Sequence, residues 1–146
     1  MASIAFFIGR ICMSMIFILA AIGKFVDYNA VAQYMSSKGM TMVPFFLIVA
    51  AAVELIGGLS LLLGFKTRWG AALLILFLIP VTGIFHDFWM VQDPAERQMQ
   101  MNEFLKNLAI WGGLFYVLAV GAGKWSLDSC CGCHTSDKHD KHDKHS

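Results

Sequence analysis

Ionisable side chains are scarce in this chain. Asp, Glu, Lys and Arg make up 14% of its 146 residues, and the formal net charge is +1. Because no basic face stands out, we expect no nucleic acid partner. The chain also lacks a haem-ligation pattern, a dinucleotide fingerprint and any iron–sulfur spacing within its apolar runs. We therefore do not expect the chain alone to hold a redox metal.

The four cysteines do not form the pattern of a secreted disulfide scaffold. Cys12 falls inside the first apolar run, whereas Cys130, Cys131 and Cys133 crowd the C-terminal tail. The first apolar run also lacks the marks of a cleaved signal peptide. No basic segment precedes it, and no small-x-small cleavage site leads into a soluble chain. We interpret this run as a retained helix.

Apolar residues are abundant, at 58% of the chain. At about 1.5 Å of helix rise per residue, four apolar runs can each cross most or all of a bilayer core of about 30 Å. The sequence predicts an all-α integral membrane four-helix bundle with short interfacial segments, in contact with the lipid bilayer. We expect this domain to cover residues 1–128 and a disordered Cys- and His-rich tail to cover 129–146. The predicted spans lie at about 4–25, 42–65, 69–88 and 105–123.

The segment 26–41 is too long for a tight turn between the first two spans. Its apolar residues recur at helical spacing, which predicts a short interfacial helix. Within the second span, Gly57 and Gly58 would let a neighbouring helix approach closely. The polar link 90–100 is expected to join the last two spans on the outer side of the membrane.

The distribution of Lys and Arg predicts the orientation in the membrane. A cytoplasmic N-terminus places seven basic residues inside and four outside, which agrees with the positive-inside rule. Both termini are then cytoplasmic. The inside set consists of Arg10, Lys66, Arg68, Lys124, Lys138, Lys141 and Lys144, and the outside set of Lys24, Lys38, Arg97 and Lys106.

Two charged residues fall deep inside predicted spans. Arg10 lies about 9 Å from the inner end of the first span, and Glu54 lies about 14 to 17 Å from the inner end of the second. Long side chains could meet across this difference, so we predict an intramembrane ion pair between Arg10 and Glu54. Such a pair either locks two helices together or serves as a proton or anion relay.

A second polar group is expected at the outer ends of the spans. Its members are predicted at one depth, on three helices, and rimmed by Phe85, Phe88, Trp89 and Phe104, which is typical of a polar pocket with an aromatic wall. Separately, each residue could be an ordinary interfacial side chain. We predict catalytic roles for His86, Asp87 and Lys106, because histidine is a common proton-exchanging side chain and Asp87 could orient it. We predict that a quinone or other substrate contacts Lys24, His86 and Asn107.

The tail carries a third candidate site. The motif CCGCH at 130–134 is followed by three Asp-Lys-His copies, and thiolates with imidazoles are donors that zinc, copper and nickel prefer. The alternative is an inert solubilising tail. If the tail binds a divalent metal, its ligands come from Cys130, Cys131, Cys133, His134, His139, His142 and His145.

These elements together resemble the DoxX/DoxD family of small bacterial inner-membrane proteins. The resemblance runs from about residue 6 to residue 128. It rests on the order and spacing of GRICMSMIFILAAIGKF (9–25), AAVELIGGLSLLLGFKTRWGAALL (51–74), FHDFW (85–89), FLKNLAIWGGL (104–114) and GAGKWSLD (121–128). The residues at family motif positions are Arg10, Lys24, Glu54, Arg68, His86, Asp87, Lys106, Asn107, Ser126 and Asp128.

The resemblance implies a multi-pass protein of the bacterial inner membrane. It also implies an accessory subunit of a quinone- or thiol-linked membrane oxidoreductase system, working with a redox partner subunit and with quinone as a possible cofactor. Two alternatives stay open. One is a carrier for a small solute or metal ion, which four spans would support only as a homo-oligomer, and the other is a structural membrane scaffold.

Overall fold

The computed structural model describes residues 2–130, and all of the regular structure in this range is helical. Four helices are long and apolar enough to cross a membrane, which confirms the predicted all-α four-span fold. The long helices are α1 (Ala2–Val26), α3 (Val43–Leu63), α4 (Thr67–Phe85) and α5 (Pro94–Val120), and the short ones are α2 (Tyr28–Ser37) and α6 (Leu127–Cys130).

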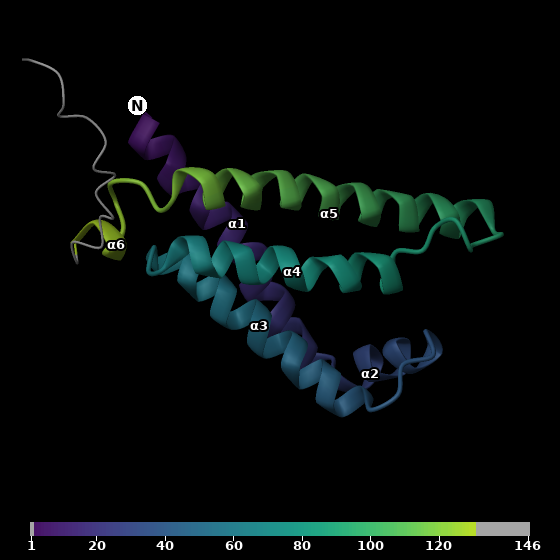
Figure 1. Cartoon of the computed structure of the whole chain (residues 1–146). Helices are drawn as coiled ribbons and strands as arrows, with labels where there is room; N and C mark the ends of the chain where they lie inside the picture. The colour runs from purple at the N-terminus through teal and green to yellow at the C-terminus, as the bar shows by residue number, and fades with distance from the viewer. Residues whose placement is uncertain (1, 131–146) are drawn as a thin grey trace, which may run out of the picture.

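The long helices form two pairs that meet at one end of the molecule. α1 packs along α3, α3 packs on α4, and α4 packs on α5. Figure 1 shows the α1–α3 pair and the α4–α5 pair converging near α6 and diverging toward α2. Apolar side chains from all four helices fill the junction, including Phe17, Leu61, Leu74 and Leu114. The packing thus brings the start of α1 close to the α3–α4 turn.

Adjacent glycines allow α3 to contact helices on two sides. A Cβ atom at Gly57 would lie 2.5 Å from Cγ of Leu74 on α4, and one at Gly58 would lie 2.9 Å from Cγ1 of Ile18 on α1. Neither position has room for a side chain, so the close approach predicted from the two glycines is confirmed. The close contacts of α3 with α4 and with α1 therefore depend on the absence of side chains at Gly57 and Gly58.

The links 26–41 and 90–100 are both largely helical. The short helix predicted between the first two spans is confirmed as α2. The link 90–100 is mostly helical, because α5 begins at Pro94. The Asp93 side chain accepts a hydrogen bond from the Glu96 N–H at 3.0 Å, and proline is favoured at the first helical position. These local signals extend α5 well beyond the predicted start near 105.

Large apolar side chains cover the outside of the four long helices. Exposed examples occur on every one of them, whereas a soluble bundle would turn such residues inward. This outward apolar surface is the face that lipid would cover. The examples include Ile8, Leu19, Ile48, Leu76 and Phe115.

Candidate functional site

The charged pair inside the bundle joins Lys24 of α1 to Glu54 of α3. The Lys24 Nζ lies 2.8 and 2.7 Å from the two carboxylate oxygens of Glu54. Glu54 is 6% exposed and belongs to the buried face of α3. Side chains on a helix point toward its N-terminus, so Lys24 near the end of α1 reaches back into the bundle. The buried carboxylate thereby gains a cationic partner.

The predicted ion pair between Arg10 and Glu54 is wrong. Arg10 donates from Nη1 to the Ala122 carbonyl at 2.6 Å and from Nη2 to the Trp125 carbonyl at 2.7 Å. The depth estimate considered only the spans, and it ignored the backbone that follows α5. That backbone has left the helix, so its carbonyls are open to a side-chain donor. Arg10 therefore holds the C-terminal segment rather than a carboxylate.

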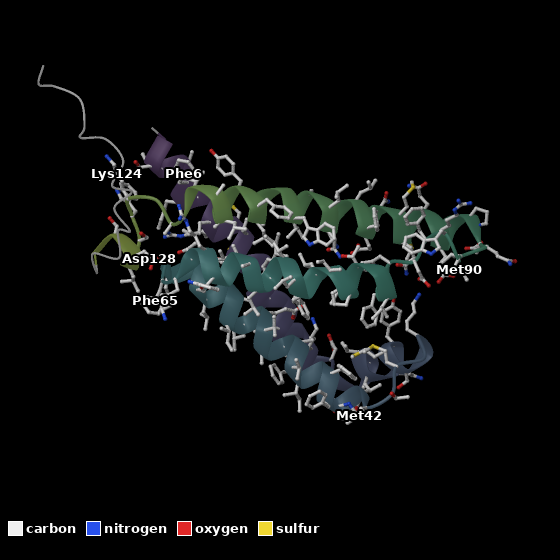
Figure 2. All side chains as sticks on the ribbon, in the orientation of Figure 1. Phe6, Met42, Phe65, Met90, Lys124 and Asp128 are labelled. Carbon is white, nitrogen blue, oxygen red and sulfur yellow. The ribbon has the colours of Figure 1, made fainter. Side chains whose placement is uncertain are left out.

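Residues 121–128 form a segment, here called the C-terminal strap, that is bound to the α3–α4 turn. Asp128 Oδ1 accepts the Lys66 N–H at 2.7 Å, and Oδ2 accepts both the N–H and the hydroxyl of Thr67 at 3.1 Å. In return the Asp128 N–H donates to the Gly64 carbonyl at 2.9 Å. Asp128 thus caps the start of α4 from a distant part of the chain. Figure 2 shows Phe6, Phe65, Lys124 and Asp128 together at this end.

The five polar residues predicted to share one outer pocket do not converge. Lys24 binds Glu54, and the Asn107 side-chain amide donates to the Thr82 hydroxyl at 3.0 Å. Lys106 is exposed and pairs with Glu103 of its own helix. Consecutive helical residues point about 100° apart, so Lys106 and Asn107 cannot face the same site. The prediction considered only the depth of these residues along their helices. It did not consider the directions in which their side chains point.

His86 contacts α5 one helical turn from an aromatic cluster. Its Nδ1 is 3.2 Å from Oε1 of Gln100 on α5. The ring of Phe88 lies 5.1 Å from Trp89 and 5.4 Å from Phe104 between centroids, and Phe104 is one turn along α5 from Gln100. We call His86, Gln100 and these three aromatic residues the outer aromatic site, after the side of the membrane predicted for them from the positive-inside rule. Gln100 was not among the predicted site residues, because the last span was predicted to begin only near residue 105.

Asp87 does not orient His86 as predicted. Its Oδ1 lies 2.6 Å from Nζ of Lys38, which follows α2. The hydrogen bond from Lys38 lowers the pKa of the Asp87 carboxyl, and the same bond raises the pKa of Lys38. The pair ties the α2 segment to the end of α4, with a further hydrogen bond from the Tyr34 hydroxyl to the Phe85 carbonyl at 3.2 Å. No sequence signal identified Lys38 as this partner.

We expect the Lys38–Asp87 pair to stabilise the protein over a defined pH range. The lowered pKa of Asp87 means that its contribution is complete above the unfolded-state pKa and is lost as pH falls through the folded-state value. The raised pKa of Lys38 means that its contribution is complete below the unfolded-state pKa and is lost as pH rises through the folded-state value. Wild type should therefore exceed Asp87→Asn in stability at neutral pH, by at most about 1 kcal/mol because the pair is partly exposed.

Thermal unfolding of wild type and Asp87→Asn in detergent, followed by circular dichroism across pH, tests this expectation. The difference in Tm should be constant at neutral pH and should vanish in acid. Asp93→Asn, which changes an acidic helix cap outside any described ion pair, is the matched control. A Tm difference that persisted below the pKa of Asp87 would contradict the assignment.

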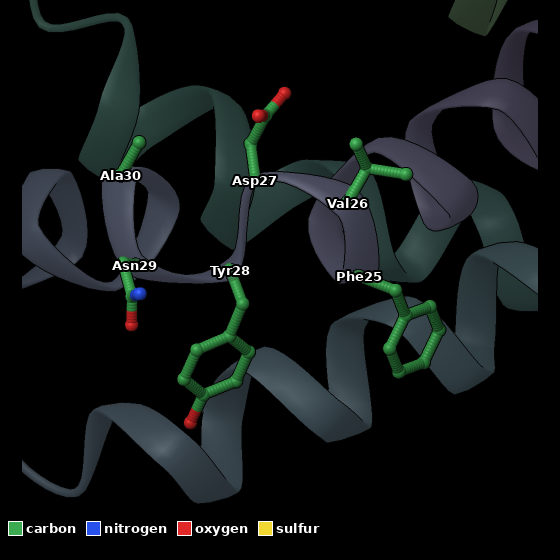
Figure 3. Close-up of a pocket in the computed structure, with 6 residues that line it drawn as sticks. All are labelled: Phe25, Val26, Asp27, Tyr28, Asn29 and Ala30. Carbon is green, nitrogen blue, oxygen red and sulfur yellow. The ribbon is translucent and has the colours of Figure 1, made fainter.

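The structure also contains an open hollow of about 490 Å³ where α1 meets α2. Figure 3 shows that Phe25 and Tyr28 point to one side of this segment and Asp27 to the other. None of the predicted site residues lines this hollow. Its lining consists of Phe25, Val26, Asp27, Tyr28, Asn29 and Ala30.

The predicted metal site cannot be placed on the fold. Within residues 2–130, no group of three or more His, Cys, Asp or Glu side chains is arranged to hold a metal ion. Of the predicted ligands, Cys130 ends α6. Those outside the described residues are Cys131, Cys133, His134, His139, His142 and His145.

The fold and its internal ion pair define a small multi-pass α-helical membrane protein. The chain belongs to the DoxX family, whose sequence profile matches residues 5–87. It is 32% identical over 121 residues to inner membrane protein YphA of Escherichia coli K12, covering 83% of this chain and 86% of YphA. It is 34% identical over 121 residues to inner membrane protein YqjF of the same organism, covering 83% and 87%. These matches and the four apolar helices identify a multi-pass inner-membrane protein.

A shorter match reaches a eukaryotic protein. The chain is 37% identical over 67 residues to the Surfeit locus protein 4 homolog of Schizosaccharomyces pombe, covering 45% of this chain and 22% of that protein. No solved structure matches the chain.

Proposed function

We propose that this protein is an accessory membrane subunit of a quinone-linked oxidoreductase system and that the outer aromatic site holds the quinone head group. The observation that supports this proposal is an imidazole in contact with Gln100, one helical turn from Phe104 in the Phe88, Trp89 and Phe104 cluster, at the end of a membrane span. Aromatic rings can stack on a quinone, and a neighbouring imidazole can exchange its protons.

The proposal includes a protonation pattern for the two His86 nitrogens. With the amide oxygen of Gln100 as acceptor, Nδ1 carries the proton and Nε2 is left as an acceptor. Oxidation of a quinol releases two electrons and two protons. In the proposal both electrons pass to a partner subunit, His86 Nε2 accepts one proton from a quinol hydroxyl, and the second hydroxyl releases its proton to water at the membrane surface. Lys24, Asp87 and Lys106 are not part of this step, because each is engaged by another side chain.

Fluorescence quenching of Trp89 by a short-chain ubiquinone tests the proposal. A variant with Phe at positions 69, 111 and 125 retains Trp89 as its only tryptophan. Saturable quenching is expected in detergent solution. His86→Ala should weaken the apparent affinity up to about tenfold, because one hydrogen bond contributes about 0.5 to 1.5 kcal/mol.

Two controls make this experiment specific. Lys106→Ala alters an exposed residue near the same end of the bundle and should leave quenching unchanged. A variant that retains only Trp69, at the opposite end of α4, should show no saturable quenching. Equal quenching of both tryptophans would mean that quinone only partitions into the detergent, and it would contradict the proposal.

The accessory role is tested on the full chain extracted from native membranes in mild detergent. Native mass spectrometry should detect a retained quinone or a redox partner subunit. Loss of both, with metal bound only when residues 129–146 are present, would favour the alternative of metal handling.

A further inference from the structure

Charge is divided unequally between the two ends of the bundle. Among residues 2–130, the end that holds α6 has four cationic residues and one carboxylate, that of Asp128, so the surplus in this range is three positive charges. Toward the α2 end, four cationic residues face six carboxylates, those of Asp27, Glu54, Asp87, Asp93, Glu96 and Glu103. The total over residues 2–130 is the same as the formal net charge of the chain, +1.

Asp128 forms no ion pair with a cationic side chain within residues 2–130. Both Asp128 oxygens accept hydrogen bonds from Lys66 and Thr67 through the backbone N–H groups and the threonine hydroxyl. Arg10 is 4% exposed, and its two Nη atoms are bound to carbonyls. Three exposed cations therefore remain, and none of them has an ion-pair partner among residues 2–130. They are Lys66, Arg68 and Lys124.

The strap brings these three cations to one surface. Lys66 precedes α4 and is tied through its backbone to Asp128. Arg68 donates from Nη2 to the Ala119 carbonyl at 3.2 Å, near the point where α5 gives way to the strap. Lys124 belongs to the strap itself. We call these three residues the basic surface.

Exposed aromatic residues accompany the basic surface. Trp69 is 77% exposed and adjoins Arg68, Trp125 is 55% exposed and adjoins Lys124, and Phe65 lies under the Lys66 ammonium at 5.9 Å. Tryptophan is enriched at the level of lipid head groups, where its ring is apolar and its N–H remains hydrated. The cations should therefore lie at the depth of the lipid phosphates.

We propose that the basic surface binds the head group of an anionic phospholipid. Lys66, Arg68 and Lys124 contact the phosphate, while Trp69 and Trp125 lie beside the glycerol region and the upper acyl chains. Exposed cations next to a membrane span favour anionic lipids, whereas the α2 end is net acidic and pairs three of its cations. The site is thus specific to one end of the bundle, and it is independent of the quinone proposal.

Native mass spectrometry of the full chain, titrated with phosphatidylglycerol or with phosphatidylcholine of the same acyl chains, measures the affinity for each lipid. Phosphatidylglycerol should bind more tightly to wild type. The triple variant Lys66→Gln, Arg68→Gln and Lys124→Gln should bind phosphatidylglycerol about a hundredfold more weakly, because the three basic residues act together. Its affinity for phosphatidylcholine should not change.

The matched control neutralises the same number of cations at the other end, by Lys38→Gln, Arg97→Gln and Lys106→Gln, and should retain phosphatidylglycerol. If the first triple variant does not fold, Lys66→Gln with Lys124→Gln spares the Arg68 contact with α5 and should still weaken binding. The proposal is overturned if both lipids bind wild type equally or if both triple variants lose binding equally. It is also overturned if millimolar inorganic phosphate displaces the lipid, which would indicate a site for a free anion.

Discussion

Replacing Lys24 with methionine should lower the free energy of unfolding by about 3 to 5 kcal/mol, the usual cost of breaking a buried ion pair. The change leaves the Glu54 carboxylate without its cation in the middle of α3, where the side chain is too short to reach water. Glu54→Leu should cost less. Lys24 lies near the end of α1, so its freed ammonium can extend toward the interface.

The double variant Lys24→Met with Glu54→Leu should recover most of the stability, because neither charge then remains in the bundle. Unfolding in mixed micelles of increasing denaturing detergent, followed by circular dichroism, supplies the four free energies of the double-mutant cycle. Glu103→Gln, which breaks the exposed pair with Lys106, is the control and should cost less than about 1 kcal/mol. Additive costs of the two single changes would show that Lys24 and Glu54 are not coupled.

Gly64→Ala should release the C-terminal strap. Gly64 has a φ of 67°, and an added Cβ would lie 2.5 Å from Cβ of Ser126 and 2.6 Å from Nη1 of Arg10. The left-handed backbone costs an alanine about 1 to 2 kcal/mol, and the overlap adds about 1 to 3 kcal/mol. Gly39→Ala is the matched control, because Gly39 has a φ of 78° with nothing within 4 Å and should show the backbone cost alone.

Limited trypsin digestion detects strap release as faster cleavage after Lys124, alongside the loss in Tm. Arg10→Leu should give the same cleavage by another route, since it leaves the Ala122 and Trp125 carbonyls without their donors. If Gly64→Ala and Gly39→Ala lost equal stability with unchanged cleavage, the strap would not be held at Gly64.

Local sequence patterns predicted the helices well, but they predicted the partners of the charged side chains poorly. The short helix between the first two spans could be predicted from apolar spacing alone, and the close contacts at Gly57 and Gly58 from residue size. Asp93 and Pro94, a helix cap followed by a favoured first residue, also indicate the early start of α5. The last span was nevertheless predicted to begin only near residue 105.

The four spans can be predicted from the amino-acid sequence, because apolar length and helical spacing are properties of each segment alone. Tertiary structure decided which charge meets which. Depth along a helix can be counted from the sequence, but the face of each helix, the direction of its side chains and the course of the strap depend on packing. Glu54 therefore meets Lys24 rather than Arg10, and Arg10 binds the strap carbonyls. Four helices place several possible partner groups at similar depths. A buried charge binds the complementary group that helix packing brings within reach.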